Sequence, residues 1–152
     1  MPIILSVAVK LAIFSSGLFL LLGMVTGVWK YAAIRASSKF RAHYYIDIAH
    51  RASLLYAPAS LILAVLAYFS VWSDSENLIY VLANLIFFFA SVFSYIFHGI
   101  TQDTDNQFRV PHRAGKWTLP QFLLTGFMLA LIIAELGATL MLCIGTAYFL
   151  FA

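Results

Sequence analysis

The chain is short of charged residues. Asp, Glu, Lys and Arg make up 10% of its 152 residues and 63% are hydrophobic, whereas about a quarter of the residues of a soluble domain are charged. This shortage excludes an ordinary soluble domain and places the protein in a lipid bilayer. The formal net charge of +3 is small and spread along the chain, which excludes a nucleic-acid-binding protein.

Cysteine and the short motifs of common enzyme classes are also lacking. The single cysteine, Cys143, lies in an apolar run, so disulfides and CxxC metal sites are excluded. No Walker loop, HExxH or GxSxG motif occurs. The segment "DTDNQF" begins like an EF-hand loop, but Phe108 replaces its glycine and Ala114 its final glutamate, which excludes calcium binding of that type. Four histidines are too few for the histidine-rich cage of a membrane di-iron enzyme.

Long apolar runs, by contrast, are abundant. Four of them approach or exceed the roughly 20 residues that a helix needs to cross a membrane. We therefore expect an all-α fold, an integral membrane four-helix bundle, with residues 1–152 as a single membrane domain. The expected spans are about 3–29, 52–72, 78–97 and 120–151, joined by loops at about 30–51 and 98–119.

The basic residues predict how the protein is oriented. All of them except Lys10 fall in the two loops 30–51 and 98–119. By the positive-inside rule, both loops face the cytoplasm and both termini lie on the non-cytoplasmic side. Trp29, Trp72 and Trp117 each fall at an expected helix end, where tryptophan prefers the membrane interface. We expect a multi-pass protein of a bacterial cytoplasmic (inner) membrane.

Small residues predict where helices pack, because they let backbones approach closely inside a bilayer. We expect such contacts, within or between subunits, along one stripe in the fourth span and one GxxxG pair in the first. These residues are Gly126, Ala130, Ala134 and Ala138, and Gly23 and Gly27.

Two ionisable residues, Lys10 and Glu135, lie inside expected spans, where a charge is costly. Either the two side chains pair and tie the first helix to the fourth, or Glu135 is buried in its neutral form.

Polar side chains gather before the second span. A helix expected between Arg35 and Ala52 would place His43, Asp47 and His50 on one face at spacing i, i+4, i+7. Arg51 lies four residues after Asp47, within reach of an ion pair. This face is either part of a binding site or an interfacial helix start whose basic residues contact lipid phosphates.

His98 ends the third span at a depth similar to that of His50, because neighbouring spans run antiparallel. We therefore expect the loop 98–119 to fold back against the polar face of the second helix and to form a crevice for a small amphipathic or anionic ligand, such as a lipid or a thiol conjugate. Arginines would hold its anionic group and histidines would exchange protons. The alternative is a polar loop with weak surface ion pairs. The candidate ligand-binding residues are Arg41, His43, Asp47, His50, Arg51, His98, Asp103, Asp105, Gln107, Arg109, His112 and Arg113.

Two other functions are open. His50 and His98 could ligate a haem b from opposite sides, which would make the protein an electron-transfer subunit; no other metal site is expected. Alternatively, the protein is a non-enzymatic accessory subunit that packs its small-residue stripe against a larger membrane complex.

The sequence also resembles a known family. "RAH" at Arg41–His43 before the second span, Pro58 within it and "SYIFHG" at the end of the third, together with four spans, resemble the MAPEG family, the membrane-associated proteins of eicosanoid and glutathione metabolism. The resemblance implies a homotrimer of four-helix bundles that binds glutathione and lipophilic substrates between subunits, and hence a glutathione- or lipid-related transferase. Tyr45 and Ile48 stand where the family has asparagine and glutamate, and Tyr95 where it has arginine.

Overall fold

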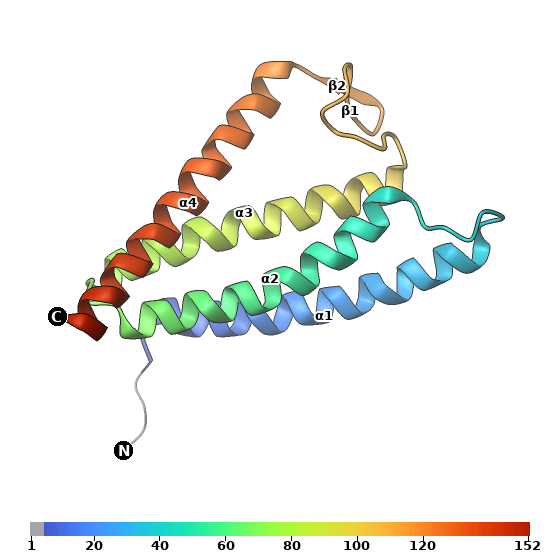
Figure 1. Ribbon diagram of the computed structural model, residues 1–152. Helices are drawn as coiled ribbons and strands as arrows, with labels where there is room; N and C mark the ends of the chain where they lie inside the picture. Colours follow the sequence, from blue (N-terminus) through green and yellow to red (C-terminus); the bar gives the residue numbers. More distant parts are fainter. Residues whose placement is uncertain (1–4) are drawn as a thin grey trace.

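The computed structural model describes residues 5–152 and contains four helices and a small β-hairpin (Figure 1). Each helix is long and apolar enough to cross a membrane, which confirms the expected all-helical, multi-pass membrane fold. The start of the first expected span, at Ile3, lies outside the described residues. The elements are α1 (Val7–Ala36), α2 (Tyr44–Phe69), α3 (Asp74–Thr101), β1 (His112–Ala114), β2 (Trp117–Leu119) and α4 (Gln121–Phe151).

Successive helices run antiparallel, so α1 begins and α4 ends at the same end of the bundle (Figure 1). The other end, which carries residues 37–43 and 102–120, is called the hairpin end below. α1 packs along α2, and α2 packs against α3. α4 packs against α3 and α2 near its C-terminus and leans away from α3 towards the hairpin (Figure 1).

The helix ends show how the chain turns between spans. Ser6 and Ser73 cap α1 and α3 with their hydroxyl oxygens, and Glu76 completes a capping box at α3. The expected helix between Arg35 and Ala52 is wrong, because α1 continues through Arg35 to Ala36 and a new helix begins at Tyr44. Phe40, between them, has φ 51°, a left-handed conformation that cannot continue a right-handed helix.

Aromatic side chains and glycines join the first three helices. Phe19 of α1 stacks on Phe89 of α3, with ring centroids 4.3 Å apart. The expected GxxxG contact is confirmed at the α1–α2 interface: a Cβ atom at Gly23 would lie 2.5 Å from Leu54, and one at Gly27 would lie 2.9 Å from the His50 ring. α1 and α2 approach this closely only because both positions lack a side chain.

The small-residue stripe of α4 divides into two parts. Ala138 is buried within the bundle, whereas Gly126 and Ala130 are exposed. A Cβ atom at Gly126 would meet no atom within 4 Å among residues 5–152. Within one subunit, therefore, the stripe packs only towards its C-terminal end.

The C-terminal half of α4 is anchored by hydrogen bonds to α2, to α3 and to the turn between them. The Trp72 indole N–H donates to the Met141 carbonyl at 2.7 Å, and the Thr146 hydroxyl donates to the Leu66 carbonyl at 2.9 Å. The Thr139 hydroxyl donates to Asn84 Oδ1 of α3 at 3.0 Å. No such bond joins the first half of α4 to the bundle among the described residues, where Phe127 packs on Phe87 of α3 with ring centroids 5.6 Å apart. The hydrogen bonds therefore hold α4 at one end only.

Candidate ligand-binding site

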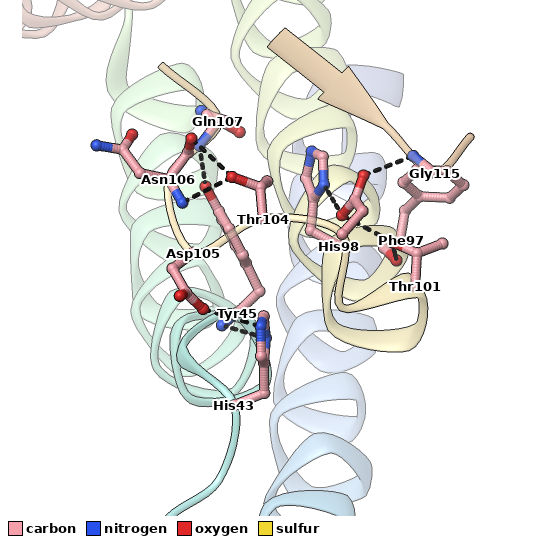
Figure 2. Close-up of polar contacts among 11 residues, drawn as sticks. His43, Tyr45, Phe97, His98, Thr101, Thr104, Asp105, Asn106, Gln107 and Gly115 are labelled. Atoms are coloured by element: carbon pink, nitrogen blue, oxygen red, sulfur yellow. Dashed lines mark hydrogen bonds and ion pairs between the residues drawn. The ribbon is translucent and has the colours of Figure 1, made fainter. Parts of the chain in front are cut away.

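The segment after α3 folds back onto the start of α2 (Figure 2). The Gln107 backbone N–H donates to the Tyr45 hydroxyl oxygen at 2.6 Å. His43, the N-cap residue of α2, places Nε2 3.1 Å from Asp105 Oδ1. These contacts confirm that the loop lies against the second helix rather than extending into solvent. The Tyr45–Gln107 hydrogen bond and the His43–Asp105 pair are together called the latch below.

Asp103 joins the end of α3 to the hairpin. Its Oδ1 accepts from His98 Nδ1–H at 2.8 Å and from the Thr101 hydroxyl at 2.9 Å, and its Oδ2 accepts from the Gly115 N–H at 2.5 Å (Figure 2). Burial acts to raise the pKa of the Asp103 carboxyl, but the hydrogen bonds from His98, Gly115 and Thr101 outweigh it and hold the pKa below its usual value. The charged carboxylate therefore sets the position of the hairpin.

The hairpin has a two-residue turn at Gly115 and Lys116, and it pairs His112 with Leu119. Gly115 has φ 63°, which suits glycine at the first position of a tight hairpin turn. Its missing side chain also lets the N–H approach the Asp103 carboxylate. The turn thereby fixes the strand that carries His112.

His112 is buried with one ring nitrogen unpartnered. Its Nδ1 lies 3.1 Å from the Gln107 carbonyl oxygen, which can only accept, so Nδ1 carries a proton. Nε2 is buried and has no hydrogen-bond partner within residues 5–152. Buried polar atoms are normally satisfied, so this nitrogen is suited to a polar group of a bound molecule.

A pocket of about 450 Å³ opens between α3, the hairpin and the start of α4. It is called the hairpin pocket below. Two helices supply its walls, which are mostly apolar, and the loop and hairpin supply a polar end. The apolar lining residues are Ala90, Phe93, Phe97, Ala114, Leu119, Leu123, Leu124 and Phe127, and the polar ones are Ser94, His98, Gln107, His112 and Arg113.

α4 begins at this pocket without a side-chain cap. Pro120 is its N-cap residue and makes no side-chain hydrogen bond, and Thr118, a natural capping residue by type, lies instead in β2 opposite Arg113. The first backbone N–H groups of a helix have no partner inside the helix and carry a partial positive charge. The positive end of the α4 dipole therefore lies next to Leu119 and Leu123, which line the hairpin pocket.

A second, polar pocket of about 320 Å³ lies in the loop itself, and Arg113 lines both pockets. Its lining includes Asp103, Asp105 and Arg109. The alternative considered from the sequence, surface ion pairs of these aspartates with Arg109 or Arg113, is not formed, because Asp103 and Asp105 bind His98 and His43. Neither arginine has a carboxylate partner in the described part of the chain, so both guanidinium groups are open to an anion.

The other candidate residues lie apart from these pockets. Asp47 pairs with Lys30 of α1 at 2.5 Å and, as expected, with Arg51 at 2.7 Å. The His50 ring bonds the Gly23 carbonyl of α1 through Nδ1 at 2.8 Å. The face that was expected to line one crevice is thus divided, because α1 packs against Asp47 through Lys30 and against His50 through Gly23 and Gly27.

The arrangement does not fit a haem between His50 and His98. The His50 ring is packed against Gly27 of α1, whereas the His98 ring contacts Tyr45, with centroids 4.9 Å apart, and binds Asp103. Tyr45 precedes His50 by five residues, about 7.5 Å along the helix. The two imidazoles differ in depth and contact different elements, so they do not face one shared gap.

Lys10 and Glu135 do not pair. Lys10 is exposed on α1, whereas Glu135 lies on α4, which packs mainly on α3 and α2. Glu135 Oε1 is buried without a hydrogen-bond partner in the described residues. The pair considered from the sequence is therefore not formed within this subunit.

The sequence analysis did not include the apolar lining of the hairpin pocket among the candidate residues. Among the polar contacts it also left out Tyr45, Thr101, Gly115 and Lys30. Gly115 carried a usable signal, since glycine followed by lysine between short alternating segments is typical of a hairpin turn. The other three are ordinary residues of helix ends, and only the tertiary contacts give them a role.

Similarity to a protein of known function would be a second route to the ligand of this site. The chain matches no protein-family model, no curated protein and no solved structure.

Proposed function

We propose that the protein binds a small amphipathic, anionic ligand in the hairpin pocket. The main support for this proposal is that one pocket of about 450 Å³ combines apolar walls from α3 and α4 with a polar end. Its volume lies in the range of about 300–1,000 Å³ that is typical of small-molecule sites. The ligand's apolar part lies between the helices and its polar part lies at the hairpin.

The charges at the polar end support an acidic ligand. Arg113 has no carboxylate partner among the described residues, and the positive end of the α4 dipole lies beside the pocket. Asp103 is already bound to His98, Thr101 and Gly115. Its two oxygens therefore already have donors before a ligand arrives. A glutathione conjugate or a lipid acid, either of which a MAPEG-like protein would take, has the required combination of an anionic and an apolar part.

The distribution of basic residues supports a site at the cytoplasmic face. Every basic residue except Lys10 lies at or near the hairpin end, and the opposite turn carries Asp74 and Glu76. The positive-inside rule then places the hairpin pocket on the cytoplasmic side and both termini on the other side of a cytoplasmic membrane. The exposed Gly126 and Ala130 on α4 support assembly with further copies of the chain, such as a trimer.

Filling the pocket tests the proposal. Ser94 lines the hairpin pocket, so Ser94→Trp places an indole where the ligand's apolar part lies. Binding of a dansyl-labelled fatty acid to the protein in nanodiscs is expected to weaken by about 5- to 150-fold, which corresponds to an overpacking cost of about 1–3 kcal/mol.

Ile86→Trp is the matched control, because Ile86 is 60% exposed on the same helix and does not line the pocket. It is expected to bind the fatty acid like the unmodified protein. Equal binding by the unmodified protein and Ser94→Trp would show that the hairpin pocket is not the site.

A further inference from the structure

A separate pocket of about 370 Å³ lies at the hairpin end between the last turns of α1 and the start of α2. It is called the basic pocket below. Lys30 and Arg41 supply its cations, Phe40 and Tyr44 its aromatic rings, and Asp47 its one carboxylate. It does not share a lining residue with the hairpin pocket.

The basic pocket carries an excess of positive charge. Asp47 is held by two cations, Lys30 at 2.5 Å and Arg51 at 2.7 Å, so its negative charge is more than neutralised. Arg41 has no carboxylate partner among residues 5–152. The positive end of the α2 dipole lies at the same place, since α2 begins at Tyr44. Arg35, which does not line the pocket, lies in the last turn of α1 and offsets the negative end of that helix.

The depth of the pocket matches the headgroup region of a bilayer. α1 has 30 residues and is therefore about 45 Å long, whereas the hydrocarbon core is about 30 Å thick. Trp29 suits the membrane interface, so we take the last turns of α1, which carry Lys30 and Ile34, to extend beyond the core. Lipid phosphates lie at this level.

The aromatic residues of the pocket point to a lipid rather than to a soluble anion. Phe40 is 78% exposed and Tyr44 is 53% exposed, although both are large apolar rings. Phe40 is held outward by a backbone with φ 51°, which is uncommon for a residue other than glycine. Exposure of an aromatic ring to water is unfavourable, whereas aromatic rings are favoured at the membrane interface.

We propose that the basic pocket binds the headgroup of an anionic phospholipid, with Arg41 and Lys30 on its phosphate and Phe40 and Tyr44 beside its glycerol and upper acyl chains. A guanidinium group matches the geometry of a phosphate with two parallel hydrogen bonds. The bound lipid would join α1 to α2 at the point where seven residues of loop, 37–43, separate them.

Native mass spectrometry of the detergent-solubilised full chain tests this inference, with phosphatidylglycerol and phosphatidylcholine of identical acyl chains as competing lipids. The protein is expected to retain phosphatidylglycerol in preference. Arg41→Gln should lower that preference by about fivefold, the usual contribution of one basic residue at a membrane surface. Arg41→Lys, which keeps the charge, should restore most of it.

Lys116→Gln is the control, because it removes one exposed cation from the same end of the protein without touching the basic pocket. Equal retention of the two lipids by the unmodified protein would overturn the inference, and so would equal losses in Arg41→Gln and Lys116→Gln. Neither result bears on the hairpin pocket, which Ser94→Trp tests separately.

Discussion

Removing one hydroxyl group should release the loop from α2. Tyr45 is buried, and its hydroxyl oxygen accepts the Gln107 N–H at 2.6 Å, which is half of the latch. Tyr45→Phe keeps the ring, and with it the contact to His98 at 4.9 Å, but leaves the Gln107 N–H without its partner. The substitution therefore removes a single hydrogen bond and preserves the packing around it.

The size of the effect follows from the burial of that N–H group. A buried donor left without a partner costs about 1–3 kcal/mol. Gln107 is only half-buried, so water can partly replace the hydroxyl group and the cost should lie near the lower limit, about 1 kcal/mol. The population of the open loop should then rise about fivefold.

Hydrogen exchange followed by mass spectrometry measures this opening directly. Peptides that cover residues 102–111 should exchange about five times faster in Tyr45→Phe than in the unmodified protein, since exchange follows local opening. Peptides from the α1–α2 interface should not change. Tyr44→Phe is the control, because Tyr44 is 53% exposed and its hydroxyl makes no hydrogen bond in the described part of the chain. Unchanged exchange in Tyr45→Phe, or the same acceleration in Tyr44→Phe, would refute the role of the latch.

Two further predictions concern the anchor of α4 and the hairpin. Gly145→Ala should destabilise the protein by about 1–3 kcal/mol, measured as a lower melting temperature in detergent, because its methyl group would lie 2.5 Å from the Trp72 ring nitrogen. Gly137→Ala, on the same helix, has open space around it and should be neutral or slightly stabilising; equal shifts in both variants would contradict the packing argument. The hydrogen bonds to Asp103 hold its pKa below the usual value in the folded protein, so the stability it contributes is present above the ordinary pKa of the carboxyl group and is lost as the pH falls through the lowered pKa. Melting temperatures between about pH 5 and about pH 3 should therefore fall more steeply for the unmodified protein than for Asp103→Asn, and parallel curves would rule out this contribution.

The sequence was sufficient for the spans but not for their ends. Apolar length identifies the part of each helix that crosses the bilayer, and all four were found in this way. It says little about turns that continue into the headgroup region. α1 runs seven residues beyond the expected limit at Trp29, and α2 begins eight residues before Ala52. The capping by His43 and the left-handed Phe40, which set these ends, are local backbone features that hydropathy does not register.

The sequence predicted part of the candidate site, namely the contact between the loop and α2, but not which polar residues lie in it. Loop residues that follow His98 in the chain were correctly expected near α2, because a short connection and an antiparallel neighbour leave little choice. The polar residues of α2 contact two different neighbours, and which neighbour each one contacts depends on how the helix is rotated about its axis. His43 faces the loop, whereas Asp47 and His50 face α1, and helical spacing alone cannot tell which neighbour covers which side.

The one-sided anchoring of α4 has a mechanical consequence. A helix of 31 residues is a stiff rod about 46 Å long, and its fixed point lies near the end remote from the hairpin pocket. The first residue of α4 lies 20 residues, or about 30 Å, from Met141, so a tilt of about 5° at this contact moves that end of the helix by about 3 Å. Side-chain adjustments around Trp72 that are too small to disturb the bundle would therefore be magnified into a change in the width of the hairpin pocket, on the opposite side of the membrane.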